Sequence, residues 1–427
     1  MTEFSQSSLA TEHWPFLLNL LPQTAYLVGG AVRDGLLSRQ PAHLDLDFVL
    51  PERAVKTARQ IASYYKAGFV LLDAERQIAR VVFQAPGREA TVDFAQMEGG
   101  TLEADLQRRD YTINAIAYNP FTAKFIDPLQ GQADLARKLL RMVAYKNLQD
   151  DPLRLLRAYR QAAQLGFQLE PDTHTALRQL AALLPQMAVE RIRTELNYML
   201  NLPQGTAWVQ RAWEDGLLSP WFPQANQRFP QLTGLDQAVT RLQETWPQLR
   251  IQVTLNLKAD LRDTIKMSRL ALAKLATLLT HDPEIAELEL VKLRYSKIEI
   301  RSAVILIKHL AQIQQVPPET MTPSQQYLLF KATGDLFPAL VVMAMAQGLI
   351  PQAMAELIQR YFTPTDPVAH PVPLVTGKDL MKRLALSPSP QIGELLDAIQ
   401  LAQVEGKIST AADAIDFAQA ILTLPPE

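Results

Sequence analysis

The strand-like runs of this sequence are confined to its first ~145 residues, and this restricts the possible folds more than any other feature. Short runs rich in β-branched and aromatic residues alternate there with helical segments such as 53–66, as is typical of an α/β or α+β domain. From about Leu148 onward, leucine and alanine recur at helical spacing. The runs that predict strands are 25–28, 46–50, 69–72, 79–83 and 90–94. We therefore expect an α+β fold, with a small mixed or antiparallel sheet and helices in an N-terminal head and only helical domains after it.

Composition excludes several classes of protein. The 427 residues are 48% hydrophobic, enough to build several cores, and the absence of cysteine excludes disulfide scaffolds, thiol nucleophiles and cysteine-ligated metals. A formal net charge of −2 excludes a uniformly basic nucleic-acid coat but leaves a local basic face possible. No run approaches ~18 uncharged apolar residues, and the first residues do not resemble a signal peptide. The expectation is a cytoplasmic protein without a transmembrane helix.

A glycine pair, Gly29-Gly30, separates the run 25–28 from an expected helix start that carries Arg33. Two glycines allow the backbone to approach a ligand closely, and the N–H groups at a helix start favour phosphate. Arg33 adds a planar fork of donors for phosphate oxygens. A strand–glycine–helix turn is more often only a turn, so the motif alone leaves both interpretations open.

Two carboxylates, Asp45 and Asp47, stand two residues apart in the otherwise apolar run 44–49. Residues i and i+2 of a strand face the same side, so the two charges repel each other unless a cation lies between them. The alternative is a solvated strand edge. Asp93 lies in a second apolar run, 91–94, which could be the adjacent strand; a single aspartate in a strand is more often structural. Carboxylates on neighbouring strands could hold two Mg²⁺ ions for phosphoryl transfer.

Two arginine-rich segments follow. Arg108-Arg109-Asp110 precedes an apolar run that contains Asn114, and its simplest explanation is a solvated turn with a salt bridge. The segment that starts at Asp150-Asp151-Pro152 has aspartates and a proline suited to a helix start. Three arginines then recur every three residues and should share roughly one helix face, either a merely solvated face or a grip for triphosphate: Arg154, Arg157 and Arg160.

Together these motifs, in this order, resemble the bacterial-type (class II) CCA-adding tRNA nucleotidyltransferases and their poly(A) polymerase relatives. The segment 190–195 and the tail segments 376–380 and 388–393 are similar to further motifs of that family. The resemblance is tight over about residues 25–200, loose between about 205 and 370, and returns in the tail. Each motif alone is weak or moderate in specificity, whereas the ordered set is strong.

The resemblance implies a role for each matching residue. Asp45 and Asp47 would ligate two Mg²⁺ ions, with Asp93 at the position of the third acidic residue. Asp110 would lie near the ribose 2′-OH, and Asp151 and Arg154 would read the base edge. The residues that would contact the nucleotide are Gly29, Gly30, Arg33, Arg109, Asp110, Asn114, Asp151, Arg154, Arg157 and Arg160.

The role of Asp151 and Arg154 also has a chemical argument behind it. Cytosine and adenine both present an amino donor beside a ring-nitrogen acceptor, which matches an aspartate acceptor next to an arginine donor. Guanine and uracil present a carbonyl oxygen where the aspartate needs a donor. The family commonly has glutamate at the position of Asp150, and we expect the shorter side chain to brace Arg154 less well.

The resemblance implies four domains and a folded RNA as partner. The head would cover residues 1–145, a base-recognising neck 146–205, a tRNA-binding body 206–362, and a linker with a tRNA-binding tail 363–427. The partners would be the acceptor and T-arm side of tRNA with CTP and possibly ATP, and neither DNA nor a membrane. A basic stripe at helical spacing could contact tRNA phosphates, although acidic neighbours make an ordinary solvated face equally reasonable: Lys258, Arg262, Lys266 and Arg269.

The expected activity is template-independent transfer of CMP from CTP to a tRNA 3′ end. CCA-adding members have a flexible segment of some tens of residues before the Arg-Arg-Asp motif, whereas here only fourteen residues separate Asp93 from Arg108. Such a short segment is a feature of members that add only CC. The alternatives are a full CCA-adding enzyme, a poly(A) polymerase, which usually has a basic C-terminal extension, and a non-catalytic RNA-binding protein.

Overall fold

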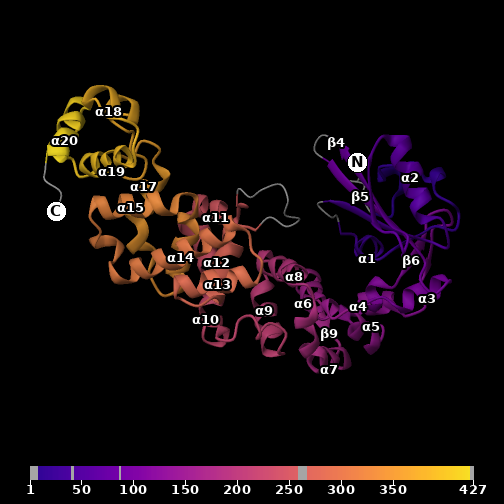
Figure 1. The fold of residues 1–427 in the computed structure, drawn as a ribbon. Coiled ribbons are helices and arrows are strands. Elements are labelled where there is room, and N and C mark those ends of the chain that lie inside the picture. Colours follow the sequence, from indigo (N-terminus) through magenta and orange to yellow (C-terminus); the bar gives the residue numbers. More distant parts are fainter. Residues whose placement is uncertain (1–7, 40–42, 86–87, 258–266, 424–427) are drawn as a thin grey trace. The chain divides into compact units, whose positions relative to one another are not determined.

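The computed structural model describes residues 8–39, 43–85, 88–257 and 267–423 (Figure 1). The chain divides into two compact units. Unit 1 consists of residues 1–199 and 211–220, and unit 2 of residues 200–210 and 221–427. Unit 1 begins with a seven-stranded sheet, and unit 2 is helical in the described residues, so the expected α+β class is confirmed.

The sheet of unit 1 has the strand order β3-β4-β5-β2-β1-β6-β7. Its central strands β2 and β5 run parallel, and every other neighbouring pair is antiparallel. A separate two-stranded sheet joins β8 to β9. The strands are β1 (Tyr26–Val28), β2 (Leu44–Leu50), β3 (Gly68–Asp73), β4 (Ile78–Ala85), β5 (Arg88–Gln96), β6 (Ala117–Asn119), β7 (Lys124–Ile126), β8 (Leu139–Leu140) and β9 (Gln168–Leu169).

The predicted strands and the structure agree where the apolar runs are long. The five predicted runs match β1 to β5 to within two residues at each end, and the helical segment 53–66 contains α2 (Ala54–Tyr65). The prediction missed β6 to β9, which have only two or three residues each. Because β9 lies at 168–169, the expectation that strands end before Leu148 is corrected by one short strand.

Alternation along the two central strands decides which side chains face the core. Phe48 on β2 stacks on Phe94 of β5 at 5.6 Å between ring centroids, and Trp14 meets Phe48 edge-on at 5.2 Å. Because successive residues of a strand point to opposite faces, the preceding residues Asp47 and Asp93 point away from this aromatic core. The two central strands thus bury aromatic side chains on one face and present the carboxylates on the other.

Helices α1 to α3 of unit 1 lie between strands of the seven-stranded sheet, α4 to α8 follow that sheet, and α6 to α8 fall within the segment predicted as the neck. Helix α6 begins after Pro152 and ends at Gly166, whose φ of 70° suits a helix C-terminus. Asp215 joins α6 to α7, because it accepts hydrogen bonds from Tyr159 at 2.8 Å and contacts His174 at 2.6 Å. The remaining helices are α1 (Gly30–Leu36), α3 (Leu102–Gln107), α4 (Gly131–Arg137), α5 (Tyr145–Asp150), α6 (Leu153–Leu165), α7 (Pro171–Leu180) and α8 (Val189–Asn201).

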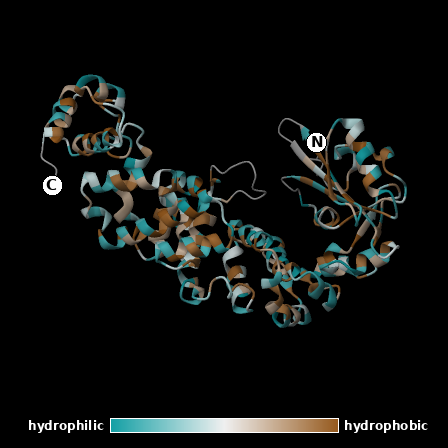
Figure 2. Ribbon diagram, in the orientation of Figure 1, coloured by the Kyte–Doolittle hydropathy of each residue, from teal (hydrophilic) through white to brown (hydrophobic). Residues whose placement is uncertain are grey.

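Unit 2 packs its helices around an apolar core, and Figure 2 shows hydrophobic residues gathered in its interior. Serine and threonine N-caps with capping boxes start α14, α15 and α18. The described helices are α9 (Gly205–Glu214, shared with unit 1), α10 (Phe229–Thr245), α11 (Pro247–Thr254), α12 (Arg269–Leu278), α13 (Pro283–Lys292), α14 (Lys297–Gln315), α15 (Pro323–Thr333), α16 (Phe337–Ala346), α17 (Ala355–Phe362), α18 (Gly377–Leu384), α19 (Pro390–Val404) and α20 (Ala411–Thr423).

One run comes closer to a membrane span than the sequence analysis expected. By length and composition alone, residues 323–346 could cross a membrane, but 72% of their apolar 18-residue stretch is buried inside the structure. The run is interrupted at Gly334, where α15 gives way to a 3₁₀ turn before α16. These residues therefore form the core of unit 2.

Candidate functional site

The carboxylates Asp45 and Asp47 face the same side of β2, as their spacing predicts. Both line a pocket of about 350 Å³ beside the glycine turn. Asp45 is exposed and accepts a hydrogen bond from the hydroxyl of Thr91 on β5, whereas Asp47 is half-buried. The pair therefore lies at the floor of a pocket open to solvent.

Electrostatics in this pocket favour a cation. Burial, together with the negative charges of Asp93 and Asp45, raises the pKa of Asp47 to about 6, against the opposing effect of Arg109 and Arg80. Neighbouring carboxylates that raise one another's pKa are stabilised when a cation lies between them. Carboxylate oxygens are also the ligands that Mg²⁺ prefers. The donor set therefore fits a divalent cation held by Asp45 and Asp47.

Asp93 lies on the strand next to β2, as the sequence suggested, and is the register partner of Asp47, but its oxygens already have another partner. Arg80 on β4 binds Asp93 with two hydrogen bonds, from Nε at 2.7 Å and from Nη2 at 2.8 Å. Among the described residues, no three aspartate, glutamate or histidine side chains converge into a group that could hold a metal. The geometry thus offers Asp45 and Asp47 as ligands and gives Asp93 an arginine partner.

The glycine turn borders the same pocket. Gly29 has a φ of +73°, and a Cβ on it would lie 3.2 Å from Asp47 Oδ2 and 3.4 Å from Arg109 Nη1. Gly30 begins α1 and has an ordinary φ. A side chain at position 29 is therefore opposed both by the backbone conformation and by the approach of the two charged groups.

Arg33 lies in the pocket, where other residues orient it. It is 8% exposed, and its Nη1 donates to Asn114 Oδ1 at 2.8 Å. Its Nε and Nη2 donate to the two oxygens of Asp34 at 3.0 and 3.1 Å. The predicted residues Arg33 and Asn114 are thus brought together directly.

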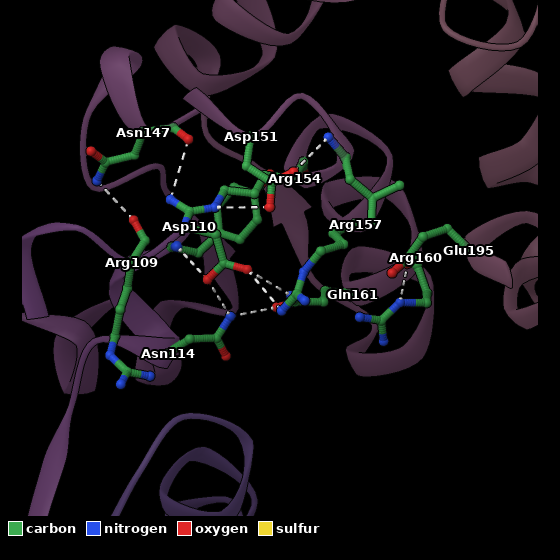
Figure 3. A network of polar contacts seen from close by, with 12 residues as sticks. Arg109, Asp110, Asn114, Asn147, Asp151, Arg154, Arg157, Arg160, Gln161 and Glu195 are labelled. Carbon is green, nitrogen blue, oxygen red and sulfur yellow. Dashed lines mark hydrogen bonds and ion pairs between the residues drawn. The ribbon is translucent and has the colours of Figure 1, made fainter. Parts of the chain in front are cut away.

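Asp110 is the centre of a buried polar network (Figure 3). Its Oδ1 accepts hydrogen bonds from Asn114 Nδ2 at 2.9 Å and from the N–H of Tyr111 at 2.8 Å. Its Oδ2 forms an ion pair with Arg157 at 3.0 Å and accepts a hydrogen bond from Gln161 at 3.4 Å. Burial alone would raise the pKa of Asp110, but Arg157 and these hydrogen bonds outweigh it and lower the pKa. Asp110 is therefore a fixed anion at pH 7.

A second, larger pocket of about 820 Å³ holds the predicted base-reading pair. Asp151 and Arg154 both line it, with Arg154 Nε 3.8 Å from Asp151 Oδ2. Arg191 from α8 approaches the same oxygen at 3.6 Å. Asp150 lines the pocket as well, but Arg154 is braced by main-chain carbonyls of Arg108 and Asn147 and not by Asp150. The shorter side chain at position 150 therefore does not determine how Arg154 is held.

The three arginines of α6 do not all line the same pocket. Arg154 lines the larger pocket, whereas Arg157 and Arg160 line the smaller one. Arg160 pairs with Glu195 of α8 and stacks over Tyr198 at 5.2 Å. A three-residue step rotates the direction of a side chain by about 60°, so two steps separate Arg154 from Arg160 by about 120°. The prediction of one shared face is corrected accordingly.

Arg109 lines both pockets. Its Nη2 donates to Asp105 Oδ2 at 3.0 Å, and Asp105 Oδ1 accepts the N–H of Glu98 at 3.2 Å. Arg109, which borders both pockets, is thus linked through Asp105 to the turn that follows β5.

Of the four residues of the predicted tRNA-binding stripe, the structure describes Arg269 alone. Lys258, Arg262 and Lys266 lie outside the described residues. Arg269 at the start of α12 is only 5% exposed, and its Nη1 donates to the carbonyl of Gln252 at 2.8 Å. Arg269 therefore stabilises the packing of unit 2 and is not part of an exposed basic face.

Sequence reasoning missed four residues of this region. Arg80, Asp105, Asn147 and Gln161 each hold a predicted site residue in place. Only Asp105 had a signal, because it stands within the charged segment that precedes the Arg-Arg-Asp motif. The other three have partners distant in sequence.

Comparison with known families identifies three segments. The model of the poly(A) polymerase head domain matches residues 25–141. A model described as a probable RNA- and SrmB-binding site of polymerase A matches 166–229, and one described as a putative tRNA nucleotidyltransferase domain 2 matches 263–418. Together these models cover most of the chain.

Curated relatives match nearly the full length. A CC-adding tRNA nucleotidyltransferase of Synechocystis is 47% identical over 95% of both chains. A CC-adding enzyme of Geobacter sulfurreducens is 32% identical, over 94% of this chain and 93% of that protein. An A-adding enzyme of Deinococcus radiodurans is also 32% identical, over 93% and 95%. Among solved structures, a CCA-adding enzyme in complex with CTP has the same fold, with a TM-score of 0.69, 22% identity, and coverage of 94% of this chain and 91% of that one.

Proposed function

Because the chain belongs to the family of CC-adding and CCA-adding tRNA nucleotidyltransferases, we propose that it transfers CMP from CTP to the tRNA 3′ end and stops after two cytidines. The Synechocystis relative at 47% identity bears the name of a CC-adding enzyme. Relatives near 30% identity include CC-adding, A-adding and CCA-adding enzymes, so similarity at that level does not separate these activities. The choice of CC addition therefore needs support from the chain itself.

The observation that carries this choice is the compact folding of the segment between Asp93 and Arg108. Strand β5 continues to Gln96, and α3 begins at Leu102, which leaves a five-residue turn between them. Asp105 fixes the turn by accepting the N–H of Glu98 at 3.2 Å. The end of the strand, the turn and the helix account for all fourteen residues. The segment therefore has no additional length for a flexible stretch that could reshape the base pocket.

For base selection we propose the pair Asp151 and Arg154 in the larger pocket. The Asp151 carboxylate would accept a hydrogen bond from the N4 amino group of cytosine, and the Arg154 guanidinium would donate hydrogen bonds to N3 and O2. Uracil would present a carbonyl oxygen to Asp151 and leave that carboxylate without a donor. The pocket would thus discriminate in favour of CTP without a nucleic-acid template.

For the chemical step we propose in-line attack of the tRNA 3′-hydroxyl on the α-phosphate of CTP. The new bond joins the 3′-oxygen to that phosphorus, the bond to the β-phosphate breaks, and pyrophosphate leaves. Asp45 and Asp47 would hold Mg²⁺, as two ions, which when bound neutralise the phosphate charge. Arg33, Arg157 and Arg160 would orient the phosphates. Asp110, kept anionic by its network, would accept a hydrogen bond from the ribose 2′-OH.

We further propose that the helical part of the chain binds the tRNA and that the enzyme acts in the cytoplasm. The head would cover residues 1–145, the neck 146–205, the body 206–362 and the tail 363–427. The acceptor and T-arm side of the tRNA would be recognised through its backbone, because a folded RNA is recognised mainly by shape. ATP would be a substrate only if the alternative, full CCA addition, is correct.

A primer-extension assay tests the proposal. The purified protein is incubated with tRNA transcripts that end before C74, after C75 and after A76, with CTP, ATP or both. We expect products that end at C75 and no transfer of AMP to a transcript that already ends at C75. Efficient addition of A76 would establish the full CCA-adding activity instead.

Two sets of variants test the assigned residues. Asp45→Ala or Asp47→Ala should abolish transfer without lowering the thermal melting temperature, because both charges are needed to hold the metal. Arg154→Ala and Asp151→Ala should weaken the discrimination of CTP from UTP by about 1–3 kcal/mol. Unaltered nucleotide preference in both of these variants would locate base selection elsewhere.

A further inference from the structure

Three consecutive main-chain carbonyls next to the site are bound by side chains from other elements. The Nδ2 group of Asn147 on α5 donates to the carbonyl of Gln107 at 2.8 Å and to that of Arg109 at 2.9 Å. The carbonyl between them, that of Arg108, accepts Nη1 of Arg154 at 2.7 Å. One amide and one guanidinium thus fix the backbone that carries Arg109.

Asn147 also contacts Arg154 itself. Its main-chain carbonyl accepts the same Nη1 at 3.2 Å (Figure 3), so this nitrogen donates to the carbonyls of both Arg108 and Asn147. The Nε of Arg154 faces Asp151. The direction of the guanidinium in the larger pocket therefore depends on where these two carbonyls lie.

The same contacts reach the smaller pocket. Arg109, whose carbonyl Asn147 binds, lines both pockets, and its side chain is held by Asp105. A shift of the backbone at 107–109 would move Arg109 and the anchor of Arg154 together. Asn147 is the side chain that spans this segment, because its amide has two N–H groups for two carbonyls.

We propose that Asn147 is a positioning residue for nucleotide selection: it fixes the backbone at 107–109 and thereby orients Arg154 toward the base. This rests on the proposed function, since it assigns base selection to the larger pocket. Asn147 also lines the larger pocket, but the proposed role acts through its hydrogen bonds to the backbone at 107–109. Its removal should make the orientation of Arg154 less defined, so that cytosine loses its advantage over uracil.

The test compares Asn147→Ala with a matched control, Asn119→Ala. The side chain of Asn119 also makes two hydrogen bonds to the backbone of unit 1, from the N–H groups of Phe121 at 2.9 Å and Thr122 at 3.2 Å, but it lines neither pocket. For each variant we would measure kcat and KM for CTP and UTP on a transcript that lacks the CCA end. Thermal melting reports the loss of stability.

We expect Asn147→Ala to lower the ratio of kcat/KM for CTP over UTP about tenfold (about 1.4 kcal/mol), because the backbone that orients Arg154 loses both hydrogen bonds from this side chain. Asn119→Ala should keep the wild-type ratio although it loses a similar number of hydrogen bonds. If the alanine variant does not fold, Asn147→Leu keeps a similar size without the donors or an added charge and should give the same drop. A wild-type ratio in a folded Asn147 variant would overturn the proposal.

Equilibrium binding separates this result from the proposed function. The affinities of the wild type and the Asn147 variants for CTP and UTP can be measured without any transfer. If the wild type binds CTP selectively but transfers no CMP, the proposed function fails while the role of Asn147 is still decided by the binding ratio. An unchanged binding ratio together with an unchanged kinetic ratio rejects the role of Asn147 alone.

Discussion

The raised pKa of Asp47 predicts how metal binding depends on pH. A carboxylate must lose its proton before it can bind Mg²⁺, so metal competes with the proton for this group. With a pKa of about 6, Asp47 carries a proton in about half of the metal-free molecules at pH 6. Mg²⁺ binding should therefore release roughly half a proton at pH 6, and affinity should fall about fivefold from pH 6 to pH 5.

The sign of the stability effect is opposite to that of most carboxylates. The pKa of Asp47 in the folded protein lies above its usual value of 3.8, so the folded state holds the proton more tightly than the unfolded state. In the absence of metal, this group should therefore make the folded protein less stable as pH rises from about 4 to about 6. Saturating Mg²⁺ should remove the trend, because it stabilises the ionised form.

Two neighbouring substitutions should move this pKa in opposite directions. Asp93→Asn removes a negative charge that raises the pKa of Asp47, whereas Arg80→Met removes a positive charge that lowers it. Calorimetric titration with Mg²⁺ in two buffers of different ionisation enthalpy counts the protons released at each pH. The midpoint of proton release should lie below the wild-type value in the first variant and above it in the second. A wild-type midpoint near 4, or shifts of the same sign, would refute the electrostatic account.

Two further predictions concern single positions. Gly29→Ala should reduce transfer at least about tenfold, since it combines a strained φ with a Cβ against Asp47, whereas Gly30→Ala, whose Cβ would meet Arg33 Nη2 only at 3.5 Å, should stay within a few-fold of wild type in the same kinetic assay. Asp236→Ala should destabilise unit 2 by about 3–5 kcal/mol in urea denaturation, because it leaves the fully buried Lys274 without its 2.7 Å ion pair; Lys274→Met, which removes the buried charge itself, should cost far less.

The sheet was predictable where burial acts on long runs. Strands β1 to β5 each carry a continuous or alternating apolar pattern, which suggested that the run with Asp93 lies next to the run with Asp47; the register that pairs these two residues comes from the structure. Strands β6 to β9 are too short to show a period, since two or three residues fit a helix, a strand or a turn equally well. Their pairing is decided by the surrounding tertiary structure.

The site was predictable in its charged motifs and not in the residues that hold them. Arg80 acts through a partner 13 residues away and Asn147 through main-chain carbonyls 38 and 40 residues away, and neither leaves a local pattern in the sequence. The basic stripe failed for a related reason. Helical spacing can place Arg269 on one face with other basic residues, but it does not tell whether that face meets solvent or another helix.

The division into two pockets has a consequence for how nucleotide choice can change in this family. The carboxylates proposed to bind metal line the smaller pocket and the proposed base-reading pair lines the larger one, with Arg109 lining both. A change of specificity from C to A need only alter the larger pocket, because both nucleotides have the same triphosphate. In this chain, Asn147 and Arg154 bind the backbone at 107–109, next to the larger pocket. Asp105 holds the side chain of Arg109 and the turn before α3. We expect a pocket held by these contacts to keep one shape, and therefore to accept cytosine and not the larger adenine.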